Sequence, residues 1–286
     1  MYRVTVSFTN TKGQRESNVA YHRSALSAIV AAAETKEFLE TEQKCTNVET
    51  SREKEKLTCN NLVLEVGRKC NMMCAHCLRG NAENHELYIG KAIQALNLFD
   101  SIGSLTFTGG EPTLYTDKII QIIDYIIGNE VPVGSFYVAS NGANLSLELM
   151  MAFCKLYAHC DEKELCSFEI SRDHYHDDID IPDYLQAFSF FGTRGENVPE
   201  AAWQHEGRAI ENGIGNRTKD YGYKFDYDEE FGCVDLVYVN SFGKLYSDCD
   251  YSYESQREIL AYSLDDITHN LATPQEIFSK TFKEEE

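Results

Sequence analysis

The chain has 286 residues, with 46 acidic against 26 basic side chains and a formal net charge of −20. This balance argues against a nucleic-acid partner, because a negatively charged surface repels a phosphate backbone and the sequence contains no basic stripe. No apolar run is long enough to span a membrane and no secretory signal follows Met1, so we expect a cytoplasmic protein.

Residues 1–57 differ in character from the rest of the chain. A strand pattern in "YRVTVSF" and a turn at "NTKGQ" precede "SALSAIVAAAETKEFLE", whose alanine-rich interior favours a helix. The mixed charges of "SREKEK" at 51–56 indicate a solvated linker. The segment groups no ligands, and we predict a small N-terminal β-α appendage without chemistry.

From Asn61 onward, short apolar strands alternate with amphipathic helices such as "DKIIQIIDYIIG". The strand signals are "NLVLEV", "SLTFT", "SFYVAS" and "SFEIS". Strand–helix repeats of this kind form parallel sheets with right-handed crossovers. The pattern predicts an α/β fold, a partial (β/α)6 TIM-like barrel over residues 58–225, with functional residues after the carboxyl ends of the strands.

The pattern after residue 225 changes to a β-hairpin that turns at Ser241–Gly243, followed by a last helix in "ATPQEIFSKTF". Thr273 is the expected cap of that helix, with Pro274 at its first position. We therefore expect a separate hairpin-and-helix module over residues 226–286.

Three cysteines, Cys70, Cys74 and Cys77, follow the first strand with the spacing C-x3-C-x2-C. In a reducing compartment, grouped cysteines indicate metal ligation sooner than disulfides. Three thiolates can hold one face of a [4Fe-4S] cluster and leave the fourth iron without a protein ligand. A structural zinc is the alternative, but it needs a fourth ligand, and His76 lies between two of the cysteines, where its reach is poor.

Two polar motifs follow the second and third strands. In "TGGEPTL", Gly109 and Gly110 let the backbone approach a ligand closely, and the Glu111 carboxylate can receive a cationic amino group. Ser140 and Asn141 can hydrogen-bond a ribose hydroxyl or a carboxylate, or they can simply form an Asn-Gly turn.

The fourth strand ends in "SRDHYH", where Ser171 and Asp173 share one face and Arg172 points to the other. Polar side chains that line a barrel interior need partners, which a ligand would supply. Arg172 is a candidate carboxylate or cofactor contact. His174 and His176 are candidate substrate-site residues, with an ordinary loop histidine as the simpler interpretation of each.

The cysteine triplet after the first strand, with the Gly-Gly-Glu element after the second, resembles the radical S-adenosylmethionine (SAM) superfamily. The resemblance implies a [4Fe-4S] cluster on the three cysteines, with SAM bound at the open iron. Reductive cleavage of SAM then gives a 5′-deoxyadenosyl radical that abstracts hydrogen from a substrate. An external one-electron reductant of flavodoxin or ferredoxin type is an implied partner.

The same resemblance assigns roles to the other motif residues. His76 occupies the position where the family places a planar ring near the adenine. The family often has a Ser-x-Asp at the place of Ser171 and Asp173, and Asp173 joins Arg172 and His174 as the candidate catalytic or substrate-site residues. The implied cofactor-binding residues are Gly109, Gly110, Glu111, Ser140, Asn141, Ser171 and His76.

The segment "GRAIENG" and a hairpin flanked by Cys233 and Cys249 partly resemble the SPASM or twitch modules of peptide-modifying radical SAM enzymes. The hairpin has one residue more than the family pattern and no cysteine follows Cys249, so a second cluster would have to borrow Cys154, Cys160 or Cys166. We expect a shortened module whose two cysteines are buried thiols or a vestigial pair.

This partial likeness favours a peptide or protein substrate. Action on a nucleoside or another small metabolite is a second possibility. A non-catalytic iron–sulfur electron-transfer protein is a third, but the Gly-Gly-Glu element argues against it, because a carrier needs no site that binds an amino acid.

Overall fold

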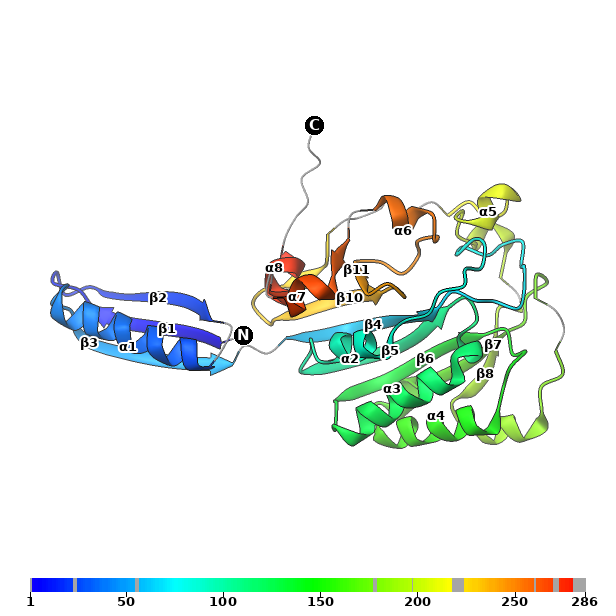
Figure 1. The fold of residues 1–286 in the computed structure, drawn as a ribbon, viewed down its shortest axis with the longest axis horizontal. Helices are drawn as coiled ribbons and strands as arrows, with labels where there is room; N and C mark the ends of the chain where they lie inside the picture. Colours follow the sequence, from blue (N-terminus) through cyan, green and yellow to red (C-terminus); the bar gives the residue numbers. More distant parts are fainter. Residues whose placement is uncertain are drawn as a thin grey trace. The chain divides into compact units, whose positions relative to one another are not determined.

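The computed structural model describes residues 2–22, 25–54, 57–176, 179–196, 198–217, 224–259, 261–269 and 273–279. The chain divides into two compact units, Met1–Lys56 and Leu57–Glu286 (Figure 1).

The first unit is a three-stranded antiparallel sheet in the order β2-β1-β3, with one helix packed against it. Its elements are β1 (Tyr2–Thr9), β2 (Arg15–His22), α1 (Ala25–Thr41) and β3 (Thr46–Lys54). Alternating side chains of β1 form a small apolar core with the helix, including Val4, Val6 and Phe8 of the strand and Ala28, Ala32 and Leu39 of the helix.

The prediction of a linker at residues 51–56 is wrong for the first four of these residues. Residues 51–54 belong to β3 and pair with residues 2–5 of β1. Strand pairing uses the backbone, and edge strands commonly carry charged side chains, so a charge run does not exclude a strand. Residues 55–56 lie outside the described part of the chain.

The second unit is built on one curved sheet in the order β12-β11-β10-β4-β5-β6-β7-β8, with β9 paired to β10. Its parallel core strands are β4 (Thr58–Gly67), β5 (Ser101–Gly109), β6 (Val133–Ser140), β7 (Ser167–Ser171) and β8 (Phe191–Arg194). Neighbouring members of this set pair in parallel throughout. Because β8 and β12 end the path, the described strands form an open sheet of partial-barrel type rather than a closed barrel.

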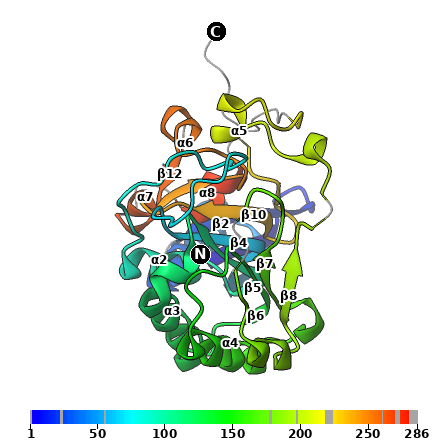
Figure 2. The same ribbon diagram turned by 90° about the vertical axis from the view of Figure 1, so that its right-hand side faces the viewer.

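Three amphipathic helices cover one face of this sheet (Figure 2). They are α2 (Ile89–Leu96), α3 (Thr116–Gly128) and α4 (Leu147–His159). Isoleucines at helical spacing in α3 are fully buried, and aromatic side chains such as Phe107, Phe136 and Phe153 fill the space between helices and sheet. The predicted strand–helix alternation is confirmed over this part of the chain.

A sixth parallel strand, β10 (Cys233–Val239), pairs with β4. It is the first strand of the predicted hairpin, and β11 (Lys244–Tyr246) returns antiparallel to it, with Val239 opposite Leu245. The predicted hairpin is confirmed, and it continues the main sheet. The sequence pattern does not reveal β8, which has four residues and only partly buried or exposed side chains.

Short elements complete the second unit. They are η1 (Pro112–Tyr115), η2 (Lys163–Leu165), η3 (Asp183–Ala187), η4 (Glu200–Ala202), α5 (Arg208–Glu211), β9 (Tyr227–Asp228), α6 (Ser255–Glu258), β12 (Tyr262–Ser263), α7 (Leu264–Thr268) and α8 (Pro274–Ser279). Thr273 caps α8 as predicted, since its hydroxyl accepts from the Glu276 amide at 3.2 Å and its own amide donates to the Glu276 carboxylate at 2.7 Å.

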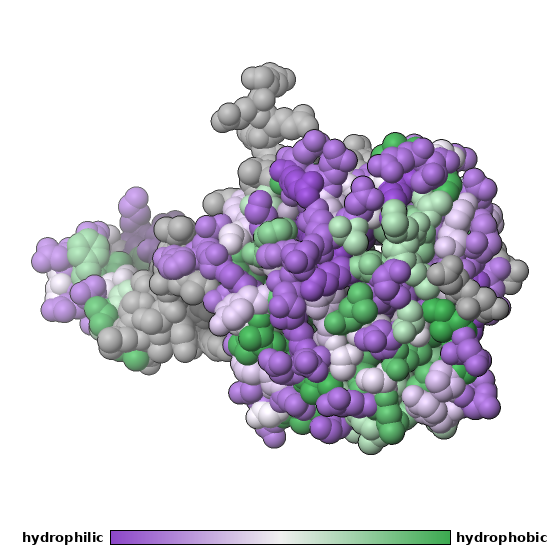
Figure 3. All heavy atoms as spheres, turned by 45° about the vertical axis from the view of Figure 1, so that its right-hand side comes forward, coloured by the Kyte–Doolittle hydropathy of each residue, from purple (hydrophilic) through white to green (hydrophobic). Residues whose placement is uncertain are grey.

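Among the described helices, none combines the length and apolar character that crossing a bilayer requires. The face of the second unit in Figure 3 mixes hydrophilic residues with scattered apolar ones.

Candidate functional site

A cavity of about 620 Å³ lies at the carboxyl ends of the parallel strands. The loop after β4, residues 68–88, carries the three cysteines, which are half-buried free thiols. Nearly all residues that the sequence motifs single out line this cavity: Cys70, Cys74, Cys77, His76, Gly109, Gly110, Glu111, Ser140, Asn141, Ser171, Asp173 and His176. The loops after four successive strands therefore meet, as the parallel order predicts.

The Gly-Gly pair permits a close approach within the chain. A Cβ atom on Gly110 would lie 2.2 Å from the Lys69 carbonyl oxygen, and one on Gly109 would lie 2.1 Å from that of Gly67. The Gly110 amide donates to the Gly67 carbonyl at 2.9 Å, and the Glu111 amide donates to that of Lys69 at 2.8 Å. The glycines thus seat the end of β5 against the base of the cysteine loop, a role additional to the predicted approach to a ligand.

The Glu111 carboxylate is only 2% exposed and is fixed by four donors. One oxygen accepts from the Thr113 amide and hydroxyl, at 3.0 and 2.6 Å, and from the Ser140 hydroxyl at 2.7 Å. The other accepts, among the described residues, only the Asn141 amide, at 2.8 Å, which leaves it capacity for one more donor. Ser140 and the Asn141 backbone therefore act on Glu111, while the Asn141 side-chain amide donates to Asn71 at 2.8 Å.

The three thiols share one polar environment. Burial raises the pKa of Cys70 and raises that of Cys74 to about 11, the neighbouring thiols adding to this and the Arg208 cation opposing it. Ligation must therefore displace protons, which requires a strongly positive group.

The spacing of these thiols tests which metal group fits them. Among the described residues, they do not form a group with all ligating atoms within 4.8 Å of one another. A tetrahedral zinc with Zn–S bonds of about 2.3 Å would hold its sulfurs about 3.8 Å apart. A single zinc would therefore need these thiols to move closer together, whereas a cluster provides one iron for each thiolate.

Arg208, for which the motifs predict no role in the site, also lines the cavity. It is 7% exposed, and its buried Nε has no hydrogen-bond partner among the described residues. Its amide donates to the Cys77 carbonyl at 3.0 Å, and Gly207 at φ +57° allows this approach, because a Cβ there would lie 2.3 Å from the Leu78 carbonyl oxygen. In the sequence, this contact is indicated only by the adjacent glycine and arginine of "GRAIENG".

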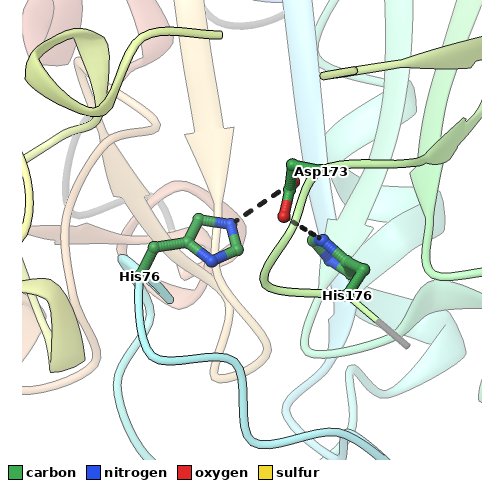
Figure 4. A group of neighbouring side chains, drawn as sticks. All are labelled: His76, Asp173 and His176. Atoms are coloured by element: carbon green, nitrogen blue, oxygen red, sulfur yellow. Dashed lines mark hydrogen bonds and ion pairs between the residues drawn. The ribbon is translucent and has the colours of Figure 1, made fainter. Parts of the chain in front are cut away.

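Asp173 meets two histidines at the cavity wall (Figure 4). One carboxylate oxygen lies 2.9 Å from His176 Nδ1 and accepts the Tyr175 amide at 2.9 Å, and the other lies 3.8 Å from His76 Nε2. Burial would raise the pKa of Asp173, but these bonds and the nearby imidazoles outweigh it and lower that pKa. Burial lowers the pKa of His76 to about 4.

The His76 ring is enclosed by other aromatic rings. Tyr175 stacks on it with centroids 4.6 Å apart and planes 24° apart, and Trp203 meets it edge-on at 4.4 Å. Tyr175 therefore occupies one face of the His76 ring, and Nε2 is the nitrogen that faces Asp173.

Two predicted site residues do not reach the cavity. Arg172 donates to the Ile179 carbonyl at 2.7 Å and lines a different cavity beside Phe191. His174 packs on Tyr175, with centroids 3.8 Å apart. Arg172 directly follows Ser171, the last residue of β7, and points away from the face of Ser171, whereas His174 lies in the turn that follows.

A buried ionic network holds both ends of the cysteine loop. Glu65 is fully buried and accepts from Arg68 Nε at 2.7 Å, from the Ser241 amide at 2.9 Å and from the Tyr238 hydroxyl. Arg79, just after the last cysteine, donates to a backbone carbonyl near α6 at 2.7 Å. Burial opposes ionisation of Glu65, but the charges of the two arginines prevail and lower its pKa. The β10 hairpin thus braces the loop.

The remaining cysteines of the second unit are spread across the sheet. Cys233 begins β10 and donates to the Asn60 side chain at 3.3 Å, whereas Cys160 and Cys166 lie at the amino end of β7. These strands are four positions apart in the sheet order, or roughly 19 Å at the usual strand spacing. Cys249 is half-buried and donates to Asp250 at 3.7 Å, at the cavity end. The structure therefore does not gather the ligands of a second cluster.

Comparisons with known proteins find distant relatives. No protein-family model matches the chain. An uncharacterized protein of Methanocaldococcus jannaschii is 34% identical over 88 residues, which cover 29% of this chain and 30% of that protein.

Among solved structures, BtrN in an open conformation is 12% identical, with a TM-score of 0.44 over 79% of this chain and 82% of that one. The protein anSMEcpe, with bound AdoMet and a Cp18Cys peptide, is 12% identical, with a TM-score of 0.39 over 78% and 80%. SuiB of Streptococcus suis, bound to S-adenosylmethionine, is 10% identical, with a TM-score of 0.40 over 92% and 75%. At this level of similarity, function has to be argued from the residues of the site.

Proposed function

We propose that this chain is a radical SAM enzyme that cleaves SAM reductively and uses the resulting 5′-deoxyadenosyl radical to abstract hydrogen from a substrate. The observation that carries the proposal is the convergence of three thiols, a Gly-Gly-Glu element and a buried arginine on one cavity. A single zinc needs neither the Gly-Gly-Glu element nor a cavity of this size.

Cys70, Cys74 and Cys77 would hold a [4Fe-4S] cluster, which supplies the electron for the cleavage when bound. Arg208 lies within electrostatic reach of Cys70 and Cys74, and its positive charge opposes the rise in their pKa values that burial causes. That charge would stabilise the thiolates that ligation requires.

Glu111 would receive the amino group of SAM at the oxygen that accepts a single internal hydrogen bond. The four donors hold this carboxylate in place before any ligand arrives, so little ordering remains to be done on binding. Met72 and Val198 line the same cavity and would help to keep water from a reactive intermediate.

For the substrate, we propose a peptide or protein, on the partial likeness of "GRAIENG" and the hairpin to peptide-modifying enzymes. A one-electron donor of flavodoxin or ferredoxin type would reduce the cluster. A small metabolite remains the second candidate substrate, and a substrate panel with 5′-deoxyadenosine release as the readout separates the two.

Anaerobic reconstitution tests the proposal. The wild-type chain should bind about four irons, change its EPR signal on addition of SAM, and release 5′-deoxyadenosine with dithionite. The combined Cys70→Ala, Cys74→Ala and Cys77→Ala variant should lose iron and cleavage, whereas Cys154→Ala, on helix α4, should keep both. Cluster binding with no response to SAM would instead identify an electron carrier, and one tightly bound zinc would identify a structural site.

A further inference from the structure

Two imidazoles and a carboxylate meet at the wall of the main cavity. His76 comes from the cysteine loop, and Asp173 and His176 come from the loop after β7, with the carboxylate between the two rings (Figure 4). One ligating atom from each lies within 4.8 Å of the others. Two histidines and one carboxylate are a ligand set typical of divalent transition metals, with further coordination positions left open.

The distances suit coordination. His176 Nδ1 and the nearer Asp173 oxygen are 2.9 Å apart, and neighbouring ligands of a six-coordinate ion with bonds of about 2.1 Å lie about 3.0 Å apart. The 3.8 Å between His76 Nε2 and the other Asp173 oxygen is too long for a hydrogen bond. Two ligands of one ion can be separated by that distance.

An ordinary hydrogen-bonded Asp–His pair would account for Asp173 and His176, but it would not account for the position of His76. Its side chain is 10% exposed, and its Nδ1 is buried with no hydrogen-bond partner among the described residues. Tyr175 and Trp203 hold the ring, so it cannot turn to find one. The other ring nitrogen, Nε2, faces Asp173 at 3.8 Å, and it is this nitrogen that can bind a metal ion shared with the carboxylate.

The carboxylate of this group is also held in place. The Tyr175 amide donates to Asp173 at 2.9 Å and fixes the orientation of the carboxylate.

We propose that His76, Asp173 and His176 form a binding site for a divalent transition-metal ion, separate from the cysteine ligands. The three protein ligands would leave coordination positions open toward the cavity, where water or a substrate oxygen or nitrogen can bind. The site does not depend on the proposed cluster, because it uses none of the three thiols.

Anaerobic titration with Co²⁺ alone tests the site. In the triple Cys→Ala variant, we expect one Co²⁺ per chain, with ligand-field absorption and without a thiolate-to-cobalt charge-transfer band. Adding Asp173→Asn or His176→Gln should weaken binding about 100-fold. His174→Gln, two residues away and outside the cavity, is the matched control and should bind Co²⁺ unchanged.

Metal analysis of the cluster-loaded wild-type chain keeps the test valid if the triple variant does not fold. It should contain one Zn²⁺ beyond the cluster iron after incubation with Zn²⁺ and removal of excess, and the His176→Gln variant should not. Absence of an extra ion in wild type, or equal binding in His176→Gln, would overturn the metal site. Neither readout uses SAM cleavage, so this failure is distinct from failure of the proposed function.

Discussion

The two ends of the main sheet place the same side chain in different surroundings. At the carboxyl end, Cys70, Cys74 and Cys77 open into a shared cavity. At the amino end, Cys59 and Cys160 are packed into the apolar core. Thiols at one end are neighbours of one another, whereas Cys59 is surrounded by strand and helix side chains.

Burial alone does not distinguish the cysteines at the two ends of the sheet. It raises the pKa of Cys59 to about 12 and, with help from the neighbouring thiols, that of Cys74 to about 11. The difference lies in what surrounds each sulfur. The carboxyl-end thiols lie near the buried Arg208 cation and line a cavity, whereas Cys160 has Cys166 as its neighbour within the apolar core. We therefore expect the reactivity of these thiols to follow their position in the loops rather than their pKa values.

The largest expected effect separates the two groups of cysteines directly. Cys74→Ala should reduce bound iron from about four to below one and reduce 5′-deoxyadenosine release to background in anaerobic assays. Cys160→Ala should keep the iron and cost about 1–2 kcal/mol of stability, as expected for a small cavity in the core. Comparable iron loss in both variants would remove the distinction between the two ends.

The second prediction concerns how the carboxyl-end loop is held. Glu65→Gln should lower the free energy of unfolding of the metal-free chain by about 3–5 kcal/mol, because it leaves buried arginine charges without their partner. Glu83→Gln removes a second, 24%-exposed partner of Arg68 and should cost about 1 kcal/mol or less. Urea denaturation measures both.

The alkylation rates of the cysteines give a second comparison of the same two variants. Glu65→Gln should speed alkylation of the cysteine loop without changing that of Cys59, because only the loop relies on the buried ions. If Glu83→Gln costs as much as Glu65→Gln, or if Cys59 becomes equally reactive, the network does not brace the loop specifically.

The third prediction uses two glycines. Gly110→Ala would place a methyl group 2.2 Å from the Lys69 carbonyl oxygen, so the base of the cysteine loop must shift. We expect a loss of about 1–3 kcal/mol in stability and less iron per chain on reconstitution. Gly128→Ala, at the end of α3, meets nothing within 4 Å and should be neutral or slightly stabilising. Iron content that is unchanged in Gly110→Ala would contradict the proposed role of this contact.

Local patterns predict the ligands and the central fold. The cysteine spacing and the Gly-Gly-Glu element each lie within a few residues, and strand–helix alternation places them at one end of a parallel sheet. The weaker signals fail for physical reasons. The strand β8 is too short to show a period, and the charged residues 51–54 pair through their backbone.

Contacts between distant segments could not be predicted. Arg208 and Trp203 reach the cavity from a segment without periodic pattern. Glu65 interrupts the apolar run of its strand, but its partners Tyr238 and Gln256 are more than 170 positions away. Such pairs depend on tertiary packing, which a single sequence does not display.

The smallest expected effect is a difference in pH dependence between the two ends of the sheet. His76 has a pKa of about 4 against an ordinary 6.5, so folding favours its neutral form and stability is lost as pH falls from 6.5 toward 4. Cys59 has a raised pKa of about 12 against 9, so its contribution is lost as pH rises between these values, together with that of buried tyrosines.

Urea titrations of the metal-free chain at acid and alkaline pH measure both losses of stability, the acid one assigned to His76 and the alkaline one assigned to Cys59. Each of these groups changes the free energy of unfolding by at most about 1.4 kcal/mol per pH unit, and by less where solvent reaches it. His76→Gln should flatten the curve between pH 6.5 and 4, a window above that of Asp173, whose pKa lies below 3.8. Cys59→Ala should leave that acid limb unchanged and reduce only the alkaline loss. An acid limb that persists in His76→Gln would show that another group at the carboxyl end carries it.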